Sequence, residues 1–588
     1  MKRYLYILCG LSILFGCSLK EEVLSNSTRD TYYKNEVQVR TGLVGCYTQA
    51  RNIYANVGFW QMTECTTDLI SLSNSTQYDA NCDVSPSRPG AASTVWSNGY
   101  SGVMRCNEMI DVLRQSTDFK EEQKLPWITE AVVMRAFYYY ILTSTFGDVP
   151  FYTEAVTEEN RASIARLPRM SARETRDSLI NELIEYLMPE SYYNERIGRQ
   201  GRQILPLERT YQNPTKAYAG AAVGLMVAGK MCLWNERYED AIDVFSVLEE
   251  IYGNYRVSGE SGEGEESASS VRMNQFKVDY PLTDVRWREK NVKESILELG
   301  NHVEEFGLAI KGGLATYCMP TRTTATLVDE EESTSDVSDI YNGIVIPELG
   351  GYAKTGTSAL PTSYFYAKLL RYASSDLRSG EYSNGKDSPR NGCGNLAWRW
   401  KGAGYVKSGV VVPDEGVYWF NKPSSSTPDG SKDKPYGNNQ PWLGDKFWCF
   451  GMYNSQDSNN YKIFRYAGVL LNLAEAHLMG RNDMQTACDY LNIVRSRAGI
   501  GTLSPDSVMN SPEALMEEIR MECARELFGE FQRKFDLVRW GIWYERAYRY
   551  NEGKYIKEYI LPCHEYWPIP AEQVTYSENA LDNNAYKE

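Results

Sequence analysis

Aromatic side chains gather in the glycine-rich middle of this 588-residue chain. Between residues 251 and 460 regular periodicity fades, and dipeptides such as Asn384-Gly385 mark tight turns. Tryptophan and tyrosine combine a flat apolar ring with a polar group, so they suit wet contact surfaces. Loops held on a rigid scaffold are where binding sites usually lie. The sequence therefore predicts a ligand-contacting region that contains Trp398, Trp400, Tyr405, Tyr418, Trp419, Phe420, Trp442 and Trp448.

Cys17 follows a short leader that predicts lipid attachment. The leader has a basic start, an apolar run from Tyr4 to Phe15 that is too short to span a bilayer, and Gly16 before the cysteine. We interpret residues 1–16 as a lipoprotein signal peptide, Cys17 as the acylated residue and residues 17–35 as a lipidated tether. Ser18 to Glu22 is similar to the surface-export signal of Bacteroidota lipoproteins, and a generic polar tether fits it equally well.

Composition excludes several classes of protein. The net charge of −15 argues against a nucleic-acid partner, whose phosphates need a basic surface. Three histidines are too few for a multi-histidine metal site. No H-E-x-x-H, G-x-S-x-G or phosphate-binding loop motif occurs, so nothing marks a catalytic centre. We predict no cofactor, although surface oxygens could bind Ca²⁺ adventitiously.

The cysteine count leaves the disulfide pattern open. Without Cys9 of the leader and Cys17, eleven of the 13 cysteines remain, so at least one has no partner within the chain. Cys46, Cys65, Cys82 and Cys106 are close enough in sequence for a bridge, and an extracytoplasmic compartment permits one. We expect buried free thiols for most of the eleven.

Helical periodicity dominates both ends of the chain. We expect helices over residues 128–146, 215–234 and 461–479, and a helix that is capped by Ser171 and reaches Leu187. A further helix should start at Ser511-Pro512. Ala241 and Phe245 have the spacing of the second helix of a tetratricopeptide-like pair, and Ala487 and Leu491 repeat it loosely. Any antiparallel helix pair with an alanine at its crossing would show the same spacing.

Charged residues near the C-terminus alternate with large apolar ones. Such charges must be paired, because an unpaired buried charge costs several kcal/mol, about 3 to 5. We therefore interpret four arginines within helical apolar patterns as structural: Arg135, Arg465, Arg495 and Arg539. The same reasoning applies to the alternating set Glu522, Arg525, Glu526, Arg533, Asp536 and Arg539.

Five segments in order resemble the SusD/RagB family of glycan-binding lipoproteins. They are Trp96–Asn107, Glu130–Pro150, Phe464–Ala476, Leu491–Gly499 and Ile519–Gly541. Asp376–Arg378 and Trp567–Pro570 also match family positions. Gly468 departs from the family, which often has an acid there, and the central region matches least.

The resemblance implies a mainly α fold, in which about four tetratricopeptide-like helix pairs carry a large irregular loop-rich insertion with the ligand site. The implied parts are an N-terminal helical part over 36–250, a variable ligand-binding region over 251–460 and a C-terminal helical part over 461–588, integrated in one domain. It also implies a SusC-like TonB-dependent outer-membrane transporter as partner. The protein would be anchored by its lipid in the outer membrane, facing outward, and would pass an oligosaccharide to that transporter.

Sugar binding needs aromatic platforms and hydrogen-bonding side chains. The first candidates for platforms are Trp398, Trp400, Tyr418 and Trp419, followed by Trp60 and Tyr78, with Asp68, Asn81 and Arg88 as hydrogen-bonding groups. For each residue, packing within the protein is an equally good explanation. Peptide or glycopeptide cargo is the alternative within the same transport role. A glycoside hydrolase is a weaker one, because nothing marks a pair of catalytic carboxylates.

Overall fold

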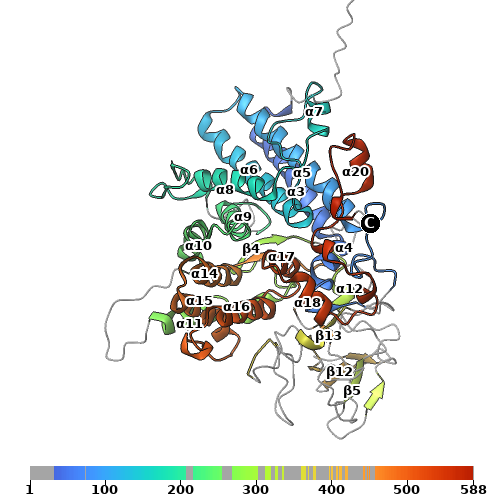
Figure 1. Cartoon of the computed structure of the whole chain (residues 1–588). Coiled ribbons are helices and arrows are strands. Elements are labelled where there is room, and N and C mark those ends of the chain that lie inside the picture. The colour runs from blue at the N-terminus through green and yellow to red at the C-terminus, as the bar shows by residue number, and fades with distance from the viewer. Residues whose placement is uncertain are drawn as a thin grey trace, which may run out of the picture.

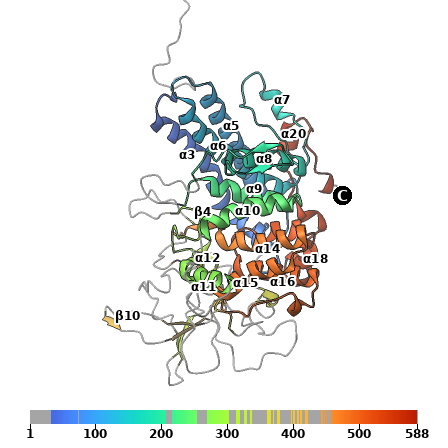
Figure 2. The ribbon, with the colours of Figure 1, turned by 90° about the vertical axis from the view of Figure 1, so that its left-hand side faces the viewer.

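A stack of helices forms the body of the molecule. The computed structural model describes residues 32–586 apart from 73–74, 207–215, 254–267 and 302–311, and between 319 and 456 it describes only short pieces. Figures 1 and 2 show the helices layered from top to bottom, and Figure 1 shows the short strands β5 (Ala325–Val328), β12 (Val417–Phe420) and β13 (Trp442–Leu443) below them. The mainly α architecture predicted from the sequence is confirmed.

Each long helix packs against the next one along the chain. The order is α3 (Glu36–Tyr54), α5 (Ala91–Gln115), α6 (Glu121–Phe146), α8 (Ala172–Leu187), α9 (Ala221–Trp234), α10 (Tyr238–Tyr252), α14 (Tyr466–Arg481), α15 (Met484–Arg497) and α16 (Pro512–Glu526). Buried side chains from all of these helices join one hydrophobic core. Within the described residues, no helix has the length and apolar content that a bilayer crossing requires.

Local sequence signals set several helix ends. The Ser171 side chain accepts a hydrogen bond from the Glu174 backbone N–H at 3.5 Å, and α8 ends at Leu187 as expected. Ser511 caps α16 in the same way, through Ala514 at 3.2 Å. Helix α9 begins at Ala221, later than the predicted start at residue 215.

The predicted Ala–Phe spacing does mark a close helix crossing. Ala241 and Phe245 are fully buried on α10, which packs against α9. The Phe245 ring fills the space beside Gly229 of α9, where a Cβ atom would lie under 3.0 Å from the ring. Glycine is therefore required at this crossing for steric reasons.

The helix expected over 461–479 begins five residues late. Residues Tyr461–Arg465 form strand β14, which pairs antiparallel with β4 (Ser295–Leu299). All five side chains of β14 are buried, and Lys462 pairs with Glu298 at 3.2 Å. Pairing with β4 satisfies the backbone of this segment and overrides its helical pattern.

The middle region contributes short strands. Strand β7 (Leu360–Pro361) pairs with β1 (Ile70–Ser71) of the helical body, and β13 (Trp442–Leu443) pairs with β8 (Leu396–Ala397). A four-stranded sheet has the order β6-β5-β12-β9, with β5 over Ala325–Val328, β6 over Thr334–Asp336, β9 over Arg399–Lys401 and β12 over Val417–Phe420. Strand β13 contacts β7, and β7 pairs with β1. These strands of the middle region are therefore joined to the helical body through β1.

A buried ionic cluster ties these parts together. Arg465 is fully buried and contacts Glu294 at 2.7 Å, Glu526 at 3.0 Å and Glu530 at 2.8 Å. Arg378 of the middle region reaches Glu522 at 2.7 Å and Glu526 at 3.1 Å on α16. The structural role predicted for the four arginines is confirmed. Besides Arg465, Arg135 pairs with Glu182, Arg539 pairs with Glu475 and Asp536, and Arg495 pairs with Glu518.

The cysteines within the described residues are all free, and only Cys563 among them is not buried. None of the bridges that the spacing of Cys46, Cys65, Cys82 and Cys106 allowed is formed. The expectation of buried free thiols is thus confirmed for this part of the chain, and Cys393 lies outside it.

Candidate functional site

Helix α18 (Trp543–Tyr550) presents tyrosines at the surface of the C-terminal part. Its inner face carries Trp543 and Ala547, one turn apart, and both are buried in a second hydrophobic cluster. The Trp543 indole N–H donates to the carbonyl oxygen of Thr66 at 2.8 Å, which fixes the helix on the body. The rotation of the helix therefore leaves Tyr544 half-buried and Tyr548 51% exposed.

Tyr550 at the end of α18 stacks on Tyr364, just after β7. The ring centroids are 3.9 Å apart and the planes differ by 23°. Both rings are partly exposed. Burial raises the pKa of Tyr364 to about 12, so its hydroxyl stays protonated at neutral pH. Because the rings lie face to face, each covers one face of the other, and the pair leaves its outer faces and edges for contact.

Arg546 holds this stacked pair in place. It donates to the Tyr364 hydroxyl at 2.6 Å and forms an ion pair with Glu517. Its guanidinium lies 5.7 Å from the Tyr364 centroid and 5.8 Å from the Tyr550 centroid. A stacked pair with a fixed hydroxyl loses little rotamer freedom when a ligand binds.

Asp68 lies beneath Arg546 and does not reach the surface. It accepts two hydrogen bonds from Arg533, at 2.9 and 2.7 Å, and is 0% exposed. Arg546 comes within 3.9 Å of the same carboxylate. The prediction that Asp68 bonds a sugar directly is wrong for this structure, because both of its oxygens serve the arginines that support the site.

Trp60 and Asn81 are also buried, at 0% and 1% exposure. The Trp60 indole N–H donates to Gly529 at 3.1 Å, so the ring is part of the core and the predicted Trp60 platform is wrong. The neighbouring Glu64 explains this burial, since it accepts backbone N–H bonds from Gly529 at 3.1 Å and Gln532 at 3.0 Å. These bonds hold the segment that carries Trp60 in the interior.

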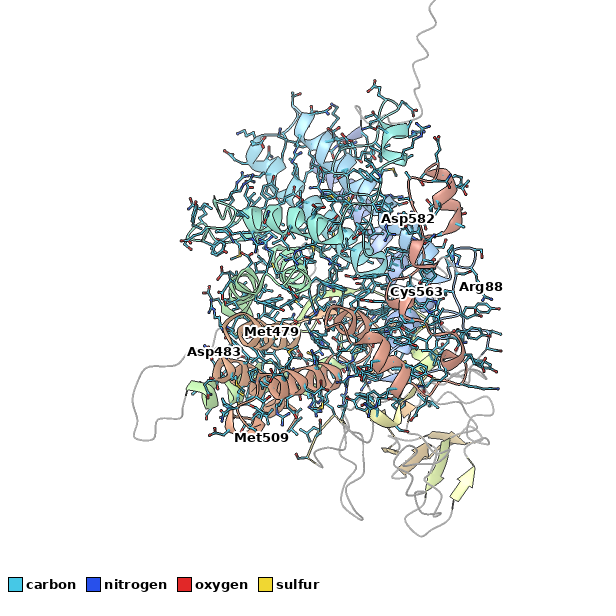
Figure 3. The ribbon with its side chains drawn as sticks, viewed as in Figure 1. Arg88, Met479, Asp483, Met509, Cys563 and Asp582 are labelled. Carbon is cyan, nitrogen blue, oxygen red and sulfur yellow. The ribbon has the colours of Figure 1, made fainter. Side chains whose placement is uncertain are left out.

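Tyr78 and Arg88 remain accessible. Tyr78 is 43% exposed, and the Arg88 guanidinium lies 4.9 Å from its ring centroid. Arg88 also pairs with Asp83. Figure 3 shows Arg88 at the outer edge of the described part, beside the segment that carries Cys563. Of the candidates near the N-terminus, these two keep the exposure that ligand contact requires.

The remaining aromatic candidates fall in the middle region. The backbones of β9 and β12 pair so that Trp400 lies opposite Tyr418 and Arg399 opposite Trp419. The backbone thus brings three of the four predicted platforms into one sheet, whereas their side chains, and Trp398 as a whole, lie outside the described residues.

Sequence reasoning missed Tyr364, Arg546 and Tyr550. The run from Trp543 to Tyr550 does carry a readable signal, since Trp543 and Ala547 are spaced one turn apart and leave aromatic and basic residues on the other faces. The stack on Tyr364 joins distant parts of the chain and has no local signal. Within the described ranges, no group of three His, Cys, Asp or Glu side chains could hold a metal ion.

The architecture and this surface define a helical binding scaffold with a strand-rich insertion, and comparisons identify its family. Residues 397–586 match the model of the SusD family, and residues 22–202 match a model described as starch-binding associating with outer membrane. SusD-like protein P25 of Formosa agariphila is 22% identical over 99% of each chain. The chain belongs to the SusD/RagB-like family.

Solved structures show the same fold. Surface glycan-binding protein A from Bacteroides uniformis superposes with a TM-score of 0.60 at 21% identity, covering 94% of this chain and 100% of that one. A SusD homolog from Bacteroides thetaiotaomicron reaches 0.65 at 16% identity, over 94% and 97%. Surface glycan-binding protein A from Bacteroides thetaiotaomicron, solved in complex with laminarihexaose, gives 0.57 at 18% identity, over 94% and 100%.

Proposed function

We propose that this protein binds oligosaccharides at the cell surface and holds them without cleaving them. The observation that carries the proposal is the partly exposed Tyr364–Tyr550 stack, fixed by Arg546, on a SusD-family scaffold. Sugar rings have apolar C–H faces that pack on aromatic rings, and their hydroxyls bond to tyrosine, arginine and carboxylate groups. By analogy with aromatic pairs, each stacked ring contributes about 0.5 to 1.5 kcal/mol. A few such contacts give the weak affinity that suits capture and release.

The same proposal includes a partner and a location. A lipid on Cys17 would hold the protein in the outer membrane, where a SusC-like TonB-dependent transporter would take up the captured sugar. The description of the family model that matches residues 22–202, which names association with the outer membrane, supports this location. Purification of the tagged full-length lipoprotein from detergent-extracted outer membrane tests the partnership. A large β-barrel protein should co-purify, and its repeated absence would count against the pairing.

Affinity electrophoresis tests the binding function. Gels cast with a panel of neutral and acidic polysaccharides should retard the wild-type protein in at least one case. Tyr364→Ala and Tyr550→Ala should each weaken retardation, with a loss of affinity of about tenfold for the pair. Tyr576→Ala is the matched control, because Tyr576 is 71% exposed on a different segment, α20 (Ala571–Tyr576). Uniform mobility across the panel would contradict glycan binding and would direct the search to peptide cargo.

A second assay separates binding from hydrolysis. The retarding polysaccharide is incubated with the purified protein, and newly formed reducing ends are measured. We expect none above the buffer control. Release of reducing sugar that is lost in a carboxylate variant would show that the protein is an enzyme.

A further inference from the structure

A cavity of about 300 Å³ lies between the end of α6 and the C-terminal segment. Its lining comes from the turn after α6, from Arg169, and from the chain that starts with the 3₁₀ helix η7 (Pro562–Glu565). This volume is at the lower end of the range for small-molecule sites, about 300 to 1,000 Å³. The cavity therefore suits a small ligand, of the size of one sugar unit. We call it the C-terminal cavity.

The C-terminal cavity combines buried apolar residues with an exposed rim. Phe146, Trp567 and Ile569 line it, and each is at most 2% exposed. Asp148 and Ala585 also line it and are exposed, so the cavity opens to solvent on their side. A sugar unit matches this arrangement, because its C–H faces pack on aromatic rings while its hydroxyls reach polar groups.

Trp567 brings an unsatisfied donor to the cavity. Its indole N–H is buried and has no hydrogen-bond partner in the described part of the chain. The residue is held in place, because its backbone N–H donates to the Thr145 carbonyl oxygen at 2.8 Å and the Lys534 ammonium lies 4.8 Å from its ring centroid. Buried donors are normally hydrogen-bonded, so a ligand group that accepts from this indole is expected.

The charges at the C-terminal cavity nearly cancel. The charged groups that line it or act on its lining residues are three acids and three bases: Asp148, Glu565, Asp582, Arg169, Arg176 and Lys534. Arg169 is committed to the protein, since its three nitrogens donate to backbone carbonyl oxygens at 2.8 to 3.1 Å. Burial lowers the pKa of Lys534 to about 7, so this base carries part of its charge at neutral pH. Neither an anionic nor a cationic ligand therefore meets a strong opposite charge.

We infer that the C-terminal cavity binds one neutral sugar unit, either free or at the end of a chain. A hydroxyl both donates and accepts, so sugar hydroxyls can bond to the carboxylates of Asp148 and Glu565 and also accept from the Trp567 indole. An ammonium group only donates and a carboxylate or phosphate only accepts, so neither serves both kinds of group. The inference adds a second site to the proposed function, because neither Tyr364 nor Tyr550 lines this cavity.

Cys563 makes the cavity directly testable. It lines the cavity and is the one cysteine within the described residues that is not buried; Figure 3 labels it. The mature protein is treated with iodoacetamide, with and without D-glucose, D-galactose, D-mannose, D-xylose or L-fucose, and mass spectrometry quantifies the alkylated Cys563 peptide. A sugar that binds should slow this alkylation about tenfold at about ten times its dissociation constant, since about a tenth of the cavities then stay free. Glucuronate and glucosamine, the charged relatives of glucose, should protect Cys563 less at the same concentration.

Variants assign the binding to this cavity. In a Tyr364→Ala/Tyr550→Ala background, which removes the proposed stack, saturation-transfer NMR should still detect the protecting sugar. Trp567→Phe removes the indole N–H and keeps an aromatic ring, and should weaken binding about tenfold in this background. Glu565→Ala, at a half-buried position, should weaken it as well. Trp287→Phe is the matched control, because its indole N–H is also buried without a partner in the described part and Trp287 does not line the cavity.

The possible results separate this inference from the proposed function. If no neutral sugar of the panel gives saturation transfer in that background or protects Cys563, the inference is overturned, and retardation in the polysaccharide gels would leave the proposed function standing. Failure of both kinds of binding would refute the two together. Equal protection by the charged relatives of glucose would overturn the assignment to neutral sugars. Equal losses in Trp567→Phe and Trp287→Phe would show an effect on the fold and would also overturn the inference.

Discussion

Arg465 shows how single residues hold this scaffold together. It lies in the core among three carboxylates, Glu294, Glu526 and Glu530, and Arg497 shares the first two. The surrounding arginines lower the pKa of Glu526 against the effect of burial. Glu526 therefore stays ionised, and its buried charge depends on these arginines for compensation.

Removal of one member should be costly. Arg465→Met leaves buried carboxylates without their main partner, so we expect the free energy of unfolding to fall by about 3 to 5 kcal/mol in urea titrations. Arg481→Met is the control, because Arg481 and Glu239 have side-chain exposures of 44% and 61% and their pair should contribute under about 1 kcal/mol. Similar losses in the two variants would contradict a structural role for the cluster.

His564 gives the protein a specific sensitivity to acid. Burial, followed by the charge of Lys534, lowers the pKa of His564 to about 4, and Nδ1 accepts a hydrogen bond from the Leu561 backbone N–H at 3.1 Å. Protonation would break that bond. Because the folded pKa is below the unfolded value of about 6.5, the unfolded state takes up the proton first. The stability that depends on neutral His564 is therefore fully present above pH 6.5 and is lost as the pH falls toward 4.

Urea titrations at pH 7 and pH 5 measure this effect. Wild-type protein should lose about 2 kcal/mol more than His564→Gln over this interval. The comparison cancels the titration of the carboxylates, which both proteins share. An equal pH dependence in the two proteins would show that His564 does not titrate as described.

At the scale of elements, the crossing of α9 and α10 shows why the sequence pattern was informative. Ala241 and Phe245 predicted a tight helix pair, and the structure adds Gly229 as the residue that admits the Phe245 ring. Gly229→Ala should lower the free energy of unfolding by about 1 to 3 kcal/mol, since its Cβ would overlap the ring. Gly501→Ala, where no atom lies within 4 Å, should be close to neutral.

A double variant separates steric overlap from a change in helix propensity. In the Gly229→Ala background, Phe245→Leu should cost less than it does in wild type, because the smaller side chain relieves the overlap. Additive losses would contradict the packing described for this crossing.

Segments with strong local patterns were predictable, and segments set by distant contacts were not. Helix α8 matched its Ser171 cap and Leu187 end, because those signals lie within the helix itself. Strand β14 was misread as helix, because its pairing with β4 comes from a distant segment. The candidate platform at Trp60 is buried for the same reason, since Glu64 binds backbone groups far along the chain.

At the scale of the whole molecule, the helical stack carries the proposed contact surface around α18. The order of the matching segments could be predicted from the sequence, because each of those segments carries its own local motif. The Tyr364–Tyr550 stack could not, because it forms where Tyr364, just after β7, meets the distant helix α18. The two stacked residues come together only when the whole chain is folded.

Hydrogen–deuterium exchange shows where a bound glycan protects the surface of the protein. The mature protein is labelled with and without a saturating oligosaccharide prepared from the polysaccharide that retards it most. We predict slower exchange in peptides covering residues 360–365 and 543–559, and unchanged exchange in α3 and α8. Protection confined to other surfaces, or none at saturation, would contradict the claim that the tyrosine surface around α18 holds the glycan.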